Sequence, residues 1–478
     1  MLTRFLLPGA LATALLAGAR SPVAPCLTIP RAGMRVAGDV RICPGAYRVP
    51  DPDEKGVLVV TASGTRIDLT GVTIRSGDSI PSRYVGIGVV SRGNDDVEVV
   101  GGVIGGYRYG IRLEGGRGHR ISGVDVSGSR AQPLQSTSIR FADSDWLDIF
   151  DPDTFETYGG GVYLKWTDGA TVTGVQAHGG QNGIGLFGSS NAYIADNDVS
   201  GNSGWGIHLW QSSHNVIVRN VAHTNVRCEA AAYSRGCDSA ALLLRNGCDS
   251  NLIADNDLRR SGDGFFLSGQ PPAMAPSEGN VVSGNDGSSS PHNAFESTFS
   301  DGNTFLQNRA DSSDYGYWLG YSSRTLVRGS TVVGSRSAGI AIEHGRDNEL
   351  RQNLVVGGNV GIRLFAPGGG PVPSRGTTVA DNTIARVGRG LVLEGTTEST
   401  VRGNVFDDVG TALVVDSAGW NTTVRGNIFL GARDAWIVAP DLAAGDNYWA
   451  AADVAATVAR VRGRISVLPW HPASAAGY

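Results

Sequence analysis

A short motif recurs along most of this 478-residue chain: a glycine followed by apolar residues at the first and third positions after it. Its shortest steps are 22 to 24 residues, and alanine replaces the glycine at Ala240, Ala294 and Ala412. Two strand-forming stretches per step, separated by glycine and asparagine, predict one coil of a β-solenoid. The glycine copies are Gly110, Gly161, Gly183, Gly206, Gly264, Gly316, Gly339, Gly361 and Gly390.

A second motif, roughly N-x-[IVL]-x-x-N-x-[VIL], runs in phase with the first. Asparagine tolerates the unusual backbone angles of turns, and its amide can bond to the backbone of the next coil. We therefore expect these asparagines to form an internal structural ladder and to have no catalytic role. The last asparagine of the motif falls at Asn197, Asn220, Asn256, Asn285, Asn308, Asn353, Asn382, Asn404 and Asn427, with Ser330 in its place once.

Two segments, "NAYIADNDVSGNSGWGIHLW" and "NELRQNLVVGGNVGIRLF", resemble coils of the right-handed parallel β-helix repeat family, which includes pectate-lyase-like and NosD-like proteins. The resemblance covers about residues 60 to 430. It implies an all-β fold, a single-stranded right-handed parallel β-helix with coils of roughly 22–24 residues. This fold hosts lyases, polygalacturonases, epimerases, tailspikes, adhesins and copper-chaperone-like periplasmic proteins, so the fold alone does not define a function.

The chain divides into four expected parts. Residues 1–19 have a positive start, an apolar run and an A-x-A site, which together predict a secretory signal peptide. Residues 20–60 are expected to form an N-terminal cap, 61–435 the parallel β-helix, and 436–478 a C-terminal cap over the last coil. Longer steps between motifs predict insertions near 130–160, 222–237, 270–279 and 366–375.

The signal segment and the five cysteines indicate a secreted or periplasmic protein. We expect disulfides between Cys26 and Cys43 and between Cys228 and Cys237, and a buried thiol at Cys248. No cysteine or histidine spacing predicts a zinc site, and no metal ligand is assigned. The net charge of −5 with no basic block gives no support to nucleic-acid binding, and no stretch predicts a membrane span. Nothing in the sequence defines an oligomeric state.

Residues 284 to 345 contain ionisable and aromatic residues that the repeat itself does not require. Ionisable groups gather there at equivalent positions of consecutive coils, and stacked coils lie about 4.8 Å apart. Glycoside hydrolysis needs a proton donor and a second carboxylate about 5 to 9.5 Å apart. We expect Glu296 to be the general acid, Asp314 or Asp263 the base or nucleophile, and His292 to be hydrogen-bonded to Asp314.

Strand alternation sends two columns of side chains outward from the glycine motif, and these columns mix aromatic, acidic and basic groups. A row of exposed aromatic side chains is unfavourable in water unless other residues cover it or a ligand binds to it. We expect this strip to be an exposed saccharide-binding face, with burial of its aromatic residues under the insertions as the alternative. The expected substrate-binding residues are Trp318, Tyr315, Glu343, His344, Phe266, His208, Trp210 and Lys165.

The sequence thus predicts a secreted carbohydrate-active enzyme that cleaves a polysaccharide, with hydrolysis slightly favoured. One alternative is a polysaccharide lyase or uronate epimerase, in which His292 with Tyr315, or Lys165, would take a proton. A second alternative is a non-catalytic periplasmic β-helix protein that binds a glycan or a metal. Three methionines and no histidine-rich tract argue against copper. Hydrolysis requires no cofactor, whereas a lyase could use calcium.

Overall fold

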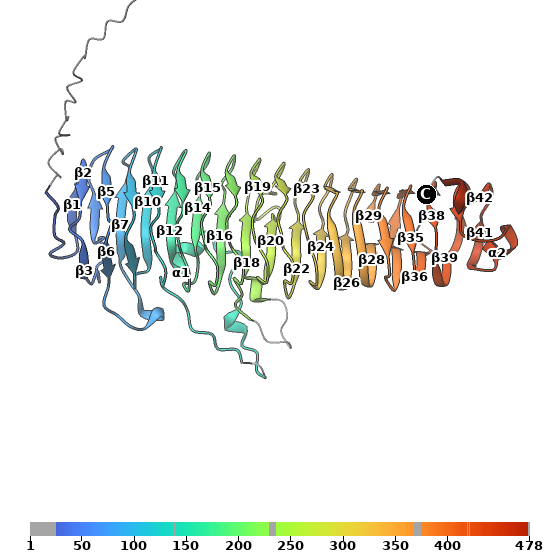
Figure 1. The fold of residues 1–478 in the computed structure, drawn as a ribbon, viewed down its shortest axis with the longest axis horizontal. Helices are drawn as coiled ribbons and strands as arrows, with labels where there is room; N and C mark the ends of the chain where they lie inside the picture. The colour runs from blue at the N-terminus through green and yellow to red at the C-terminus, as the bar shows by residue number, and fades with distance from the viewer. Residues whose placement is uncertain are drawn as a thin grey trace, which may run out of the picture.

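The computed structural model describes residues 25–476 apart from 138, 229–235, 368–373, 418 and 420. The chain winds into a straight stack of coils that forms a long rod (Figure 1). All pairings between its named strands are parallel, and sequential coils lie side by side. The predicted fold class, a parallel β-helix, is confirmed. The predicted signal peptide, residues 1–19, lies outside the described residues.

Each coil contributes a strand to a first column, which begins at the glycine motif. The strands of this column are β1 (Met34–Val36), β4 (Leu58–Val60), β7 (Ile87–Arg92), β10 (Tyr109–Glu114), β12 (Gly160–Lys165), β14 (Ile184–Phe187), β16 (Trp205–Trp210), β18 (Ala240–Arg245), β20 (Asp263–Ser268), β22 (Asn293–Thr298), β24 (Tyr315–Gly320), β26 (Thr331–Glu343), β28 (Leu354–Phe365), β32 (Arg389–Glu394), β36 (Val409–Val415), β39 (Ala432–Ala443) and β41 (Val461–Ser466).

A second column of three-residue strands follows the asparagine motif and forms a separate 15-stranded sheet. Its strands are β2 (Asp39–Arg41), β5 (Arg66–Asp68), β8 (Glu98–Val100), β11 (Arg120–Ser122), β13 (Thr171–Thr173), β15 (Tyr193–Ala195), β17 (Val216–Val218), β19 (Leu252–Ala254), β21 (Val281–Ser283), β23 (Thr304–Leu306), β25 (Leu326–Arg328), β27 (Glu349–Arg351), β30 (Thr378–Ala380), β34 (Thr400–Arg402) and β37 (Thr423–Arg425).

A third column is regular only toward the two ends of the rod, and isolated parallel bridges such as Asp198 to Val221 link its middle. Its strands are β3 (Gly45–Arg48), β6 (Val72–Arg75), β9 (Val103–Gly105), β31 (Thr383–Ala385), β35 (Val405–Asp407), β38 (Ile428–Phe429), β40 (Asn447–Trp449) and β42 (Trp470–Pro472), with the first halves of β26 and β28 between them. The short strands β29 (Ser374–Arg375) and β33 (Thr396–Thr397) pair apart from these columns.

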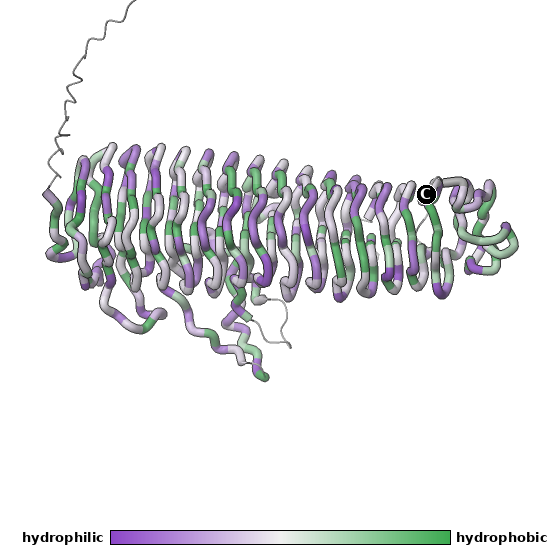
Figure 2. The backbone as a smooth tube through the Cα atoms, in the orientation of Figure 1, coloured by the Kyte–Doolittle hydropathy of each residue, from purple (hydrophilic) through white to green (hydrophobic). Residues whose placement is uncertain are grey.

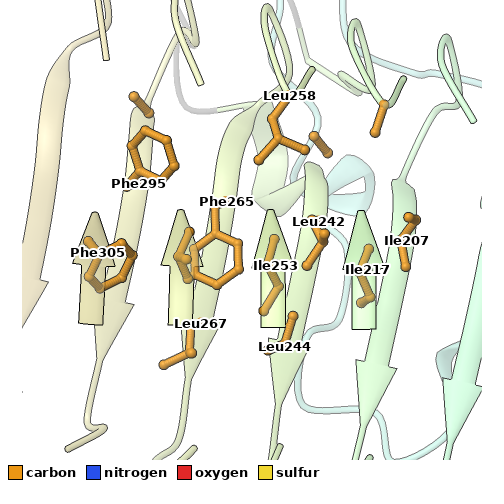
Figure 3. Packing of buried hydrophobic residues seen from close by; sticks show 14 of the residues in the cluster. Ile207, Ile217, Leu242, Leu244, Ile253, Leu258, Phe265, Leu267, Phe295 and Phe305 are labelled. Carbon is orange, nitrogen blue, oxygen red and sulfur yellow. The ribbon is translucent and has the colours of Figure 1, made fainter. Parts of the chain in front are cut away.

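The hydrophobic core lies inside the coils. Side chains of equivalent positions stack on one another, for example Leu242, Phe265 and Phe295 from successive strands of the first column (Figure 3). They meet Ile253 and Phe305 from the second column, and all five are fully buried. Hydrophobic and hydrophilic segments accordingly alternate along the coils (Figure 2). No coil could bury these residues alone, so the stacking of neighbours supplies the core.

The expected asparagine ladder is confirmed. Asn220 Nδ2 donates to Asn256 Oδ1 at 3.0 Å, and Asn256 Nδ2 donates to Asn285 Oδ1 at 2.9 Å. Each amide also donates to a backbone carbonyl of the preceding coil, as Asn256 does to Ile217 O at 3.0 Å. These side chains are buried. Because these amides donate and accept between neighbouring coils, the asparagines bind the stack together.

Three insertions interrupt the coils; the longest projects from the lower edge of the rod in Figure 1, and residues of the first and third pack on strands of the first column. The longest holds η2 (Asp143–Asp145) and α1 (Thr154–Tyr158); Asp153 caps α1 by accepting from Glu156 N at 3.0 Å. The second ends in η4 (Gly236–Asp238), and the third is a turn closed by Gln270 and Met274. A further short element, η1 (Pro81–Arg83), precedes β7.

The predicted disulfides Cys26–Cys43 and Cys228–Cys237 are present. Cys248 is a buried free thiol, as expected, and burial raises its pKa to about 12, so it is no nucleophile at neutral pH. β1 already stacks on β4, and β41 and β42 stack beyond residue 435 with α2 (Val454–Val458) and η6 (Ala473–Ala476) beside them. No helix among the described residues is long and apolar enough to cross a membrane.

Candidate functional site

Three titratable side chains meet on the outer surface of two neighbouring coils. Asp263 begins β20, His292 directly precedes β22, and Glu296 points outward from the middle of β22. The parallel register pairs Phe266 with Glu296, so the residues that begin β20 and β22 are also neighbours. We call Asp263, His292 and Glu296 the acid cluster. The sequence motif placed these residues on adjacent coils, and the structure brings them together.

One nitrogen or oxygen atom from each side chain of the acid cluster lies within 4.8 Å of the other two. His292 Nδ1 is 3.0 Å from Asp263 Oδ1 and 4.0 Å from Glu296 Oε2. Asn293, a buried residue that the sequence analysis did not assign to the site, links two members. Its backbone N–H donates to Asp263 Oδ1 at 2.9 Å, and its side-chain Nδ2 donates to Glu296 Oε2. The sequence could have indicated Asn293, because it occupies the same position in its coil as Asp263 does one coil earlier.

The surroundings of Glu296 shift its pKa strongly. Burial, and next the negative charge of Asp263, raise its pKa from an ordinary value near 4.5 to about 8, although His292 and the Asn293 amide act in the opposite direction. The side chains of Asp263 and Glu296 are 1% and 10% exposed, against 23% for His292. A carboxyl group with such a pKa carries a proton at neutral pH and can donate it.

The buried cation Arg245 lies close enough to Glu296 for their charges to interact. Arg245 is 2% exposed, and its Nη1 donates to Ser268 Oγ at 2.7 Å, which also accepts from Thr298 Oγ1 at 2.8 Å. Its Nη2 donates to Met274 Sδ at 3.0 Å. Burial lowers the pKa of Arg245 to about 10, even though Asp238 and Glu296 raise it. The guanidinium therefore remains charged and adds positive potential beside Glu296.

Asp314 occupies the position equivalent to His292 on the next coil, and its backbone N–H donates to His292 O at 3.0 Å. Its carboxylate accepts from Ser337 Oγ at 2.7 Å and lies 4.0 Å from Arg336 Nε. This side chain is 28% exposed, so water reaches it. The expected hydrogen bond between His292 and Asp314 stays a prediction; the ring nitrogen Nδ1 lies closest to Asp263.

Aromatic side chains continue the surface on the C-terminal side of Glu296. Trp318 pairs with Glu296 in the strand register, and its ring lies 4.8 Å from that of Tyr315 and 5.7 Å from that of Phe365. We call Tyr315, Trp318 and Phe365 the aromatic platform. Tyr315 and Trp318 are half-buried. At the edge Arg363 lies over the Phe365 ring and pairs with Glu394 at 2.6 Å, and Glu343 is half-buried on β26.

On the N-terminal side of Glu296 the predicted exposed strip is wrong. His208, Trp210 and Phe266 were expected to bind substrate on an open face, but they are only 1%, 6% and 5% exposed. Insertion residues lie over the strands, so these side chains form a second apolar layer. We call the insertion residues that pack on this face the cover: Leu147, Ile149, Phe155, Tyr158 and Met274.

His208 and two further predicted residues, Lys165 and His344, have structural contacts. His208 Nδ1 is 2.9 Å from Thr154 Oγ1, and burial lowers the pKa of His208 to about 3, so it is neutral. Lys165 donates to Asp153 at 2.6 Å and so holds the base of the cover. His344, expected to be exposed, is 7% exposed and stacks on Tyr321 with ring centroids 4.8 Å apart.

The acid cluster also has the donor set of a metal site, which the sequence analysis did not assign. Each of its three residues can offer one ligand atom. Two carboxylates and an imidazole suit borderline divalent cations. Within the described part of the chain no donor reaches the buried Asn293 Oδ1, a fourth potential ligand atom beside the cluster. The described cluster includes no thiolate or thioether, the ligands that select Cu(I).

The model of a family described as periplasmic copper-binding protein (NosD) matches residues 64–262 and 251–459. The chain belongs to this NosD family. The match covers the coils that hold the acid cluster, the cover and the aromatic platform. The family is described as periplasmic, and two disulfides are typical of proteins exported from the cytoplasm. No curated protein matches the chain.

Several solved structures are similar to this member of the NosD family. The catalytic unit of a thermostable alpha-1,3-glucanase from Streptomyces thermodiastaticus shares 13% identity, covers 82% of this chain and 63% of its own, and gives a TM-score of 0.46. A mutant of the periplasmic alginate epimerase AlgG shares 11% identity over 77% and 78% of the two chains, with a TM-score of 0.44. The Dettilon tailspike protein shares 14% identity, covers 86% of this chain and gives a TM-score of 0.41. The chain spans 62% of the tailspike's length.

Proposed function

We propose that the protein is a carbohydrate-active enzyme that hydrolyses a glycosidic bond at the acid cluster. The observation that carries the proposal is the meeting of Asp263, His292 and Glu296 within 4.8 Å at the point where the cover ends and the aromatic platform begins. A proton donor and the two half-buried rings of Tyr315 and Trp318, which pack on the buried Phe365, then lie side by side. Sugar rings expose apolar C–H faces that stack on aromatic side chains, and a glycosidic oxygen needs a proton in order to leave.

Each residue has a distinct role in this proposal. Glu296 donates its proton to the glycosidic oxygen while the bond from that oxygen to the anomeric carbon breaks. Asp314 takes a proton from the water that forms the new bond to this carbon, since its carboxylate is accessible. Asp263 is nearly inaccessible, so we assign it the task of holding His292 and of keeping Glu296 protonated by its negative charge. Elimination at a uronate would use the same cluster with His292 as the base.

The test is an incubation of the mature protein with a panel of neutral and acidic polysaccharides, with and without calcium. New reducing ends without the ultraviolet absorbance of an unsaturated uronate indicate hydrolysis, and the absorbance indicates a lyase. The Glu296→Gln variant should lower kcat about 10²- to 10⁴-fold, the usual effect of removing a general acid. Glu278→Gln, which alters an exposed carboxylate, should leave kcat unchanged. No product from any polysaccharide would contradict the enzyme proposal.

A metal-binding role is the second candidate, and the donor set of the acid cluster favours it. Metal binding requires ionised carboxylates, whereas the proposed acid requires a protonated Glu296, so the two functions exclude each other at this site. Titration calorimetry with Mn²⁺, Zn²⁺ and Cu²⁺ separates them. Micromolar binding that is lost in His292→Ala, together with no saccharide product, would establish the metal role. Absence of binding for all three ions would remove it.

A further inference from the structure

The surface around Glu296 differs on its two sides along the rod. In the column of outward side chains that contains Glu296, the residues on the N-terminal side are buried: Tyr163, His208, Leu243 and Phe266 are at most 5% exposed. On the C-terminal side the same column continues with the half-buried Trp318, the buried Ala341, the half-exposed Arg363 and the buried Val392.

The cover causes the burial on the N-terminal side. Leu147, Ile149 and Tyr158 pack in one apolar cluster with Leu243 and Phe266, the neighbours of Glu296 in the preceding coils. Phe155 and Met274 pack in a second cluster with Tyr163 and Trp210. The Phe150 ring lies 5.0 Å from the guanidinium of Arg245. The cover therefore lies above the strands, directly beside Glu296 along the rod.

Several polar contacts hold the cover and its insertions in place. Arg227 and Asp145 form an ion pair at 3.4 Å with both side chains 1% exposed, and Arg227 Nε donates to Asp145 O at 2.6 Å. Leu147 N donates to Cys237 O at 3.3 Å, which ties the first insertion to the disulfide-closed second one. Lys165 holds Asp153 at the other end. Breaking a buried ion pair costs free energy, so the cover is a fixed part of the fold.

Insertion residues do not cover the aromatic platform in the described part of the chain. The apolar cluster that contains it consists of residues of β24, β26, β28, β32 and β36 only. Arg363, Glu394 and Glu343 flank the rings with charged groups that can bond to hydroxyls. This side therefore offers a ligand both apolar rings and polar partners next to Glu296, whereas on the other side the cover buries the outward side chains of the strands next to Glu296.

We propose that the acid cluster receives the end of a saccharide chain, with the rest of the chain lying over the aromatic platform toward the C-terminus of the protein. An internal segment of a saccharide, extending along the rod in both directions from Glu296, would have to pass through the space that the cover fills. The enzyme would then release a short product of constant length from one end of its substrate. This inference rests on the proposed function, and it adds the mode of action and the direction in which the substrate lies.

The experiment compares chain shortening with product length on the polysaccharide cleaved in the panel. We expect one short product from the earliest time points and a viscosity that falls slowly relative to the release of reducing ends. A rapid loss of viscosity with fragments of many lengths would overturn the inference and leave the proposed function intact. Trp318→Ala should raise KM about tenfold, whereas the matched variant Trp166→Ala, at a 66% exposed tryptophan on the other side of the cluster, should not. The reverse pattern would also overturn the inference.

If the panel yields no product, the proposed function fails first, and a binding measurement decides the inference. Calorimetry with hexasaccharides of the same polysaccharides is then the probe. Binding that is lost in Trp318→Ala and kept in Trp166→Ala supports a saccharide on the aromatic platform. No binding of any hexasaccharide to the wild-type protein overturns it.

Discussion

At the scale of single residues, the proton on Glu296 should make the stability of the protein depend on pH. Its pKa is about 8 in the folded protein because the carboxyl is buried beside Asp263, against an ordinary value near 4.5. Between these values the folded protein holds a proton that the unfolded chain has lost. The stabilisation is complete below about pH 4.5 and is lost as the pH rises through 8, by up to ~1.4 kcal/mol per pH unit.

Glu296→Gln removes this titration. We therefore expect the unfolding free energy of the variant, relative to the wild type, to rise between pH 5 and 8 and to level off above 8. Denaturant unfolding at several pH values measures the difference. Glu278→Gln is the matched control at an exposed site, and its difference from the wild type should be independent of pH. A difference that is equally flat for Glu296→Gln would show that this carboxyl ionises normally.

The activity should follow the same proton. If Glu296 is the general acid, kcat must fall as the pH rises through about 8, because the ionised carboxylate cannot protonate the leaving oxygen. A pH profile of kcat on the cleaved polysaccharide measures this limb. An activity that persists unchanged to pH 10 would exclude Glu296 as the proton donor.

At the scale of elements, the buried ion pair of Arg227 with Asp145 should control the attachment of the cover. Arg227→Ala leaves Asp145 buried without its cation, which costs about 3–5 kcal/mol. The coils beneath keep their own core and asparagine ladder, so the loss should be local. We expect limited proteolysis within residues 139–159 to accelerate at least tenfold, with cleavage sites read by mass spectrometry.

Arg219→Ala is the control for this prediction. Arg219 pairs with Asp196 at 2.8 Å, but the two side chains are 50% and 55% exposed. Exposed pairs contribute about 0–1 kcal/mol, so proteolysis should be unchanged. Equal cleavage rates for Arg227→Ala and the wild type would mean that apolar packing alone holds the cover.

The same elements explain how much the sequence could predict. The columns of the solenoid follow from the period of glycine and asparagine, because each coil repeats the geometry of its neighbour. That register was enough to place Asp263, His292 and Glu296 on adjacent coils. It could not show where the insertions return to the rod, since no repeat constrains their path. His208, Trp210 and Phe266 therefore look exposed in the sequence but are buried under the cover.

At the scale of the whole molecule, a stack in which each coil contacts only its neighbours should respond locally to damage. Asn256 lies in the middle of the rod, and its side chain accepts from Asn220 and donates to Asn285 and to Ile217 O. Asn256→Ala leaves buried partners on both adjacent coils unsatisfied, at about 1–3 kcal/mol for each such group. Its effect should therefore concentrate around β17, β19 and β21.

Hydrogen–deuterium exchange tests this prediction. In Asn256→Ala we expect faster exchange of the amides in β17, β19 and β21 and unchanged exchange in β34 and β37, which belong to distant coils. Asn359→Ala, at an exposed position of β28, is the control and should cost less than about 0.5 kcal/mol. Uniformly faster exchange along the entire rod would mean that the solenoid opens as one cooperative unit. The acid cluster on β20 and β22 would then depend on every coil of the stack and not only on its neighbours.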